Sequence, residues 1–163
     1  MRSLQGPTGW AVGGVALAAA LFHLYTAGFG FLEPRQQRSV HLLLLLPIAF
    51  LVWPARSTSP KDRPSVPDWC LAARALLPNL YSLLAAHQIN QRMENVDPLS
   101  TGQLVLGVLA TLLLLEGLRR AVTPVLAGLV VIGIGYLFLT ESMPGILQYR
   151  NMPFAEIVET MYL

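Results

Sequence analysis

The chain has 163 residues, of which 54% are hydrophobic and only 12% are charged, and its formal net charge is +2. A soluble domain of this length has a more even composition, so the sequence predicts an all-α integral membrane bundle in contact with membrane lipid. The few cations are dispersed and are not interleaved with aromatic residues, which excludes a nucleic-acid surface.

Two apolar blocks come first in the chain, a long one and a short one. The block from about Gly9 to Leu32 is long enough to cross the roughly 30 Å hydrocarbon layer, and its length favours a retained helix over a secretory signal peptide. The block from Val40 to about Pro54 is a short span. A polar turn is expected between them, at Glu33, Pro34, Arg35 and Arg38. The stretch 56–68 is the most polar linker, and we expect it to be exposed to solvent.

The third block, from Trp69 to Ile89, is interrupted by polar residues and by Pro78. A bent spanning helix and an interfacial helix both fit, and we favour the bent span. Two clearer blocks follow, from Gly102 to Leu118 and from Val122 to Thr140. The sequence therefore predicts four or five transmembrane helices within residues 1–150.

The last segment, 151–163, is expected to form a C-terminal amphipathic helix. Its apolar residues recur at helical spacing from Phe154 onward, with Glu156 and Glu159 between them. The chain stops without a polar tail, and two interpretations stay open. The segment is either a frayed terminus or a junction that leads to a partner subunit or a longer polypeptide.

The basic residues predict an orientation. On alternate sides of a five-span arrangement, the larger basic group shares the side of the amino terminus, which the positive-inside rule assigns to the cytoplasm. That group comprises Arg2, Arg56, Lys61, Arg63, Arg119 and Arg120. A third block that does not span would reverse the later loops.

Polar residues with a possible function are few. Glu116 precedes Arg119 and Arg120 by three and four residues, so on a helix the three side chains share one face. We expect an ion pair that anchors the helix end, in preference to a role in moving substrate or ions. His23, inside the first block, is expected to be a packing residue and not part of a proton path.

Metal, redox and catalytic chemistry lack candidates. Cys70 is the only cysteine, and the three histidines, His23, His41 and His87, are scattered along the chain. There is no nucleophile elbow, no phosphate-binding glycine–lysine loop and no zinc-binding histidine pair. The sequence predicts no cofactor, no metal and no catalytic residue.

One ordered series of motifs runs through most of the chain: Arg38 and His41, Trp53-Pro54, Asp68-Trp69, Tyr81, Arg92, the run Leu115 to Arg120, and Pro144-Gly145. From about Tyr25 to Leu163 the chain resembles the amino-terminal small membrane region of fused permeases of the tripartite ATP-independent periplasmic (TRAP) transporters, mostly of the TAXI type. Where the family leads us to expect an aspartate near the start of the fourth block, this chain has Gln103 or Gly102.

The resemblance implies a scaffold in a sodium-coupled transporter for organic acids, in the bacterial inner membrane. A much larger permease part would hold the substrate and sodium sites, and a periplasmic TAXI-type binding protein would deliver the substrate. Segment 151–163 would lead toward that larger part. Glu116, Arg119 and Arg120 would anchor the chain. Loop or partner contacts would fall to Asp68, Tyr81, Arg92, Pro144 and Gly145.

Two other classes remain open. A small intramembrane enzyme or maturation factor would need Arg74, His23 and His87 to converge on one buried site. A stand-alone channel or exporter would function without a partner.

Overall fold

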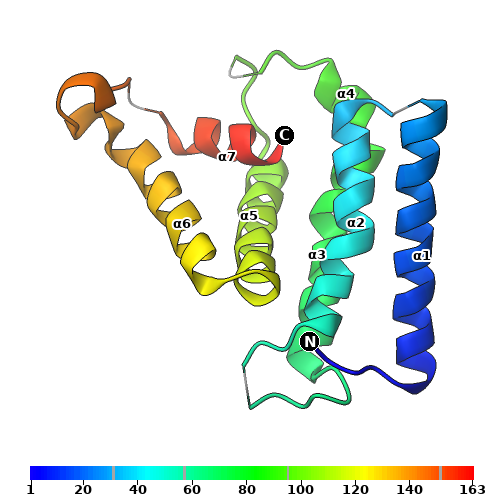
Figure 1. Ribbon diagram of the computed structural model, residues 1–163. Helices are drawn as coiled ribbons and strands as arrows, with labels where there is room; N and C mark the ends of the chain where they lie inside the picture. The colour runs from blue at the N-terminus through cyan, green and yellow to red at the C-terminus, as the bar shows by residue number, and fades with distance from the viewer. Residues whose placement is uncertain (31, 57, 95, 151) are drawn as a thin grey trace. The chain divides into compact units, whose positions relative to one another are not determined.

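The computed structural model describes residues 1–30, 32–56, 58–94, 96–150 and 152–163, and these residues form helices and no strand (Figure 1). The all-α class predicted from the composition is confirmed for this part of the chain. Contacts divide the chain into two compact units, Met1–Ile89 and Asn90–Leu163, and each is described by itself.

Three helices are long and apolar enough to cross a membrane. They are α1 (Gly6–Phe29), α5 (Thr101–Ala121), and α6 (Pro124–Leu139) together with the 3-10 turn η1 (Thr140–Ser142). The described chain covers little of α1 and α6. Helix α1 buries only Ala19 and Thr26, and α6 buries only Ala127. Apolar side chains left uncovered on such helices indicate contact with lipid or with other membrane helices.

In the first unit, α2 (Pro34–Val52) packs along α3 (Val66–Leu84) and, less extensively, against α1 (Figure 1). The polar turn expected at 33–38 is wrong, because Arg35 and Arg38 lie inside α2. Pro34 occupies the first helical position, where a proline costs no hydrogen bond, and the Arg and Gln residues that follow favour helix.

The third block also differs from the prediction. The linker ends earlier than expected, since α3 begins at Val66, and Asp68 is fully buried instead of exposed. The helix continues through Pro78 and is interrupted at Ala85, after which α4 (Ala86–Asn90) follows. Next to Pro78, the Asn79 side chain bonds to the helix backbone: Asn79 Nδ2 donates to the Ala75 carbonyl, one turn earlier, at 2.8 Å.

The second unit contains α5, α6, η1, a second 3-10 turn η2 (Gly145–Leu147) and α7 (Phe154–Tyr162). A capping box starts α5: the Gln103 amide N–H donates to Ser100 Oγ at 3.2 Å, and the Ser100 N–H donates to Gln103 Oε1 at 3.0 Å. Gln103, where the family resemblance leads us to expect an aspartate, therefore satisfies the helix start. Thr123 caps α6, with its Oγ1 accepting from the Leu126 N–H.

The helix expected in 151–163 is present as α7, which packs against α5. Gly107 of α5 makes this close approach possible. A Cβ at Gly107 would lie 2.5 Å from Val158 Cγ1 and 3.1 Å from Tyr162 Cδ1. The buried face of α7, which includes Ile157, Val158 and Tyr162, thus meets a helix of the same unit. Its location at a membrane interface stays a prediction.

Candidate functional site

The expected ion-pair cluster is present at the end of α5. Arg119 binds Glu116 with two parallel bonds, from Nε to Oε2 at 2.7 Å and from Nη2 to Oε1 at 2.8 Å. Arg120 Nε donates to the same Oε1 at 2.6 Å. Bidentate guanidinium–carboxylate bonds of this kind are strong and directional, because both partners are charged.

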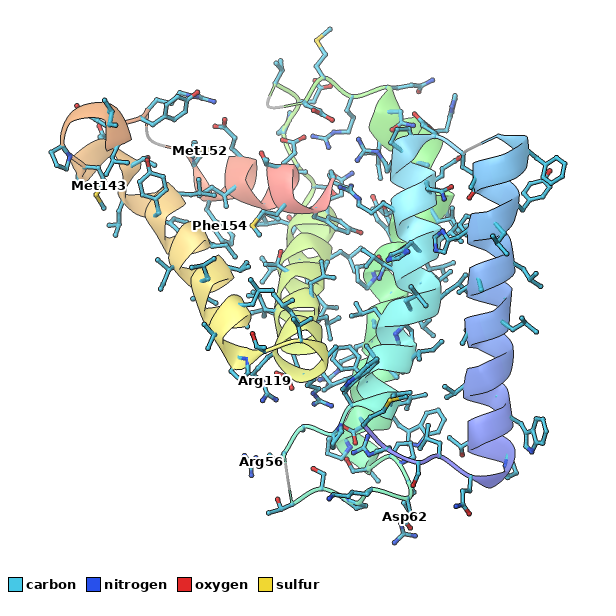
Figure 2. All side chains as sticks on the ribbon, viewed as in Figure 1. Arg56, Asp62, Arg119, Met143, Met152 and Phe154 are labelled. Carbon is cyan, nitrogen blue, oxygen red and sulfur yellow. The ribbon has the colours of Figure 1, made fainter. Side chains whose placement is uncertain are left out.

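The two arginines of this cluster differ in exposure. The Arg119 side chain is 40% exposed, whereas the Arg120 side chain is 3% exposed. Figure 2 labels Arg119 where α5 gives way to the turn before α6. One carboxylate and two guanidinium groups leave a net positive charge at this helix end. That end carries the negative pole of the helix dipole, which the cations complement.

A second cluster, buried in the first unit, joins Arg2 to Asp68. Arg2 Nη2 lies 2.7 Å from Asp68 Oδ2, and both side chains are fully buried. The same Oδ2 accepts from the Ser65 backbone N–H at 2.9 Å and from the Ser65 hydroxyl at 2.5 Å. Asp68 at the start of α3 therefore makes its contacts inside the chain.

Arg2 also closes the end of α2. Its guanidinium donates to the carbonyl oxygens of Leu51 at 3.0 Å and Pro60 at 2.9 Å, and its backbone N–H donates to Val52 O at 2.9 Å. Carbonyls in the last turn of a helix have no partner within the helix, and a cation satisfies them well. We did not predict this role for Arg2, because the only signal in the sequence is one cation near the amino terminus.

Two of the three histidines meet, although they are 18 residues apart. His41 Nδ1 of α2 and His23 Nε2 of α1 are 3.0 Å apart, and one of them donates the proton of that bond. Beside them Gln37 Nε2 donates to Thr26 Oγ1 at 3.0 Å. His23 is therefore paired with a second histidine, and its expected role as a packing residue stays a prediction. No group of three or more metal-ligating side chains occurs among the described residues.

The residues expected in loop or partner contacts are dispersed. Arg92 pairs with Glu159 of α7 at 3.3 Å and donates to the Asp97 carbonyl at 2.6 Å. Tyr81 lies within α3 and is partly buried. Pro144 and Gly145 form an exposed turn, in which Gly145 has a φ of 63°. A positive φ favours glycine, which explains the residue type at that turn.

The three residues that the intramembrane-enzyme interpretation requires do not converge in the described structure. Arg74 on α3 and His87 on α4 are both exposed, and His23 is paired with His41. These three residues therefore share no buried site.

In the described residues, the fold defines a class, a helical protein with three helices long and apolar enough to cross a membrane. No protein-family model matches this chain, and no curated protein and no solved structure matches it significantly. The family resemblance read from the sequence motifs accordingly stays a prediction.

Proposed function

We propose that this chain is the small membrane component of a TRAP-type secondary transporter in a bacterial inner membrane. In this role it braces a large permease that carries sodium and organic acid, while a periplasmic TAXI-type protein delivers the substrate. The supporting observation is the Glu116 cluster. The run Leu115 to Arg120, which is the best element of the resemblance, folds as the ion-paired helix end that a membrane anchor needs.

The proposal includes α2 and α3 as two further spans. Each has 19 residues, which at about 1.5 Å per residue reach roughly 28 Å, close to the roughly 30 Å hydrocarbon layer. Their prolines, Pro47 and Pro78, are tolerated in membrane helices where neighbouring groups satisfy the backbone. With five spans and a cytoplasmic amino terminus, α7 would lie along the opposite membrane interface.

We assign the partner contact to α6. Gly128, Gly133 and Gly135 have no heavy atom within 4 Å of the place where a Cβ would stand. Leu129 and Ile132, between them, are exposed. Without side chains at the glycines, a helix of the large permease can approach the α6 backbone closely, and the van der Waals packing that results is one of the forces that associate helices in lipid.

The predicted anchoring and contact residues have three different roles in this proposal. Glu116, Arg119 and Arg120 hold the end of α5 at the cytoplasmic surface. Pro144 and Gly145 are exposed and available to a partner. Asp68 and Arg92 act indirectly, because their ion pairs with Arg2 and Glu159 hold this chain's own segments in place.

Co-purification tests the proposal. The tagged chain, expressed with the reading frames that adjoin it in its genome, should purify with a permease of many helices and support sodium-dependent uptake of organic acids. Gly133→Leu should reduce the amount of co-purified permease. The control variant Thr101→Leu, which changes an exposed residue at the start of α5, should not reduce it. A chain that purifies alone and moves ions or solutes by itself in liposomes would overturn the proposal in favour of a channel or exporter.

A further inference from the structure

An apolar groove of about 390 Å³ runs between three helices of the first unit. Its volume falls within the range of about 300–1,000 Å³ that is usual for small-molecule sites. Apart from the Thr8 hydroxyl and the Trp69 indole N–H, its side chains are hydrocarbon. All three helices line it, with Val12 and Val15 from α1, Leu44 and Ile48 from α2, and Trp69 and Leu76 from α3 among the lining residues.

One end of the groove adjoins the cationic linker, which we define as the described residues 53–56 and 58–65 between α2 and α3. Leu51 and Trp69, which line the groove, flank this linker in the chain. The linker carries three exposed cations, Arg56, Lys61 and Arg63, against one exposed acid, Asp62. Figure 2 labels Arg56 and Asp62 beyond the ends of α2 and α3.

The amino-terminal residues hold the linker in place. Arg2 Nε donates to Pro60 O at 2.9 Å, and the Ser3 backbone N–H donates to Lys61 O at 3.1 Å. The backbone around the cations is therefore tied to the helix ends that border the groove. The cationic linker therefore lies beside the apolar groove, just as the phosphate of a phospholipid lies beside its acyl chain.

We propose that the groove binds one acyl chain of an anionic phospholipid and that the lipid's phosphate contacts the cationic linker. Arg and Lys bind phosphate through charge-assisted hydrogen bonds, and basic segments beside membrane helices select anionic lipids. The proposal rests on α1 crossing the bilayer and is independent of the transport role.

Tryptophan quenching by brominated lipid tests the binding. Trp69 lines the groove and is 49% exposed, whereas Trp10 lies outside it and is 84% exposed. The variant Trp10→Phe/Trp53→Phe leaves Trp69 as the reporter, and Trp53→Phe/Trp69→Phe leaves Trp10 as the matched control. Both are reconstituted in phosphatidylcholine vesicles that contain a small, equal fraction of brominated phosphatidylglycerol or brominated phosphatidylcholine.

We expect brominated phosphatidylglycerol to quench Trp69 several-fold more than brominated phosphatidylcholine does, and both lipids to quench Trp10 equally. Loss of one linker cation, as in Arg63→Gln, should lower the preference for phosphatidylglycerol over phosphatidylcholine about fivefold. One cation near the membrane surface changes the affinity for an anionic lipid by about that factor. Asp62→Asn should preserve or strengthen it. Ala11→Leu, which fills the groove, should lower Trp69 quenching by phosphatidylglycerol. Equal quenching of Trp69 by both lipids, or no quenching of Trp69, would overturn the proposal.

Discussion

The buried pair of the first unit and the Glu116 cluster of the second hold their charged residues in different ways. In the first, the buried ion pair joins Arg2 and Asp68, which are 66 residues apart in the sequence. In the second, Glu116 bonds with arginines three and four residues later on the same helix. The first kind of pair ties elements together and depends on the complete fold, whereas the second kind forms wherever its helix forms.

The largest expected effect comes from breaking the buried pair. Asp68→Asn keeps the size of the side chain but leaves the buried Arg2 without its counter-charge, which costs about 3–5 kcal/mol. Denaturant unfolding in detergent micelles, followed by circular dichroism, measures this loss.

Two further variants sharpen that measurement. Asp62→Asn, at an exposed position, should change the stability by less than about 0.5 kcal/mol. Arg2→Met combined with Asp68→Asn should recover part of the loss, because no buried charge is left unpaired. Equal stability of the Asp68 variant and the wild type would show that the pair does not form in solution.

An intermediate effect is expected where α7 meets α5. The Cβ added by Gly107→Ala would lie 2.5 Å from Val158 Cγ1, and overpacking of this kind costs about 1–3 kcal/mol. Gly133→Ala, which meets no atom within 4 Å, should leave the stability unchanged or raise it slightly. Adding Val158→Ala to Gly107→Ala should restore stability, and a purely additive double mutant would contradict the contact.

The smallest effect is expected for the local cluster. Glu116→Gln removes the carboxylate charge that two arginines share, but the cluster is partly exposed, so we expect a loss of only about 1 kcal/mol. Glu141→Gln, at an exposed residue of η1, serves as the control and should be neutral. A loss as large as that for Asp68→Asn would remove the contrast between the buried pair and the Glu116 cluster.

The same contrast explains how much of the structure could be predicted. Apolar blocks predicted the helices from Gly6 to Phe29 and from Thr101 to Leu139, and the spacing of Glu116, Arg119 and Arg120 predicted their ion pairs. Both signals are local, since they depend on residues within a few turns.

Contacts between distant residues left no such signal. The pairing of His23 with His41 depends on how α1 and α2 pack, and the burial of Asp68 depends on Arg2. The start of α2 at Pro34 also differs from the predicted polar turn. The Arg and Gln residues that follow Pro34 are polar, as in a turn, but both residue types favour helix.

The Arg2–Asp68 pair also constrains the order of events while the protein is made. A ribosome adds about 5–20 residues per second, so Arg2 waits several seconds before Asp68 is synthesised 66 residues later. During that interval α1 and α2 are synthesised before the residue that binds Arg2 to the start of α3 exists. Arg2 therefore reaches its buried environment only after the end of α2 and the start of α3, which supply its partners, have both been made.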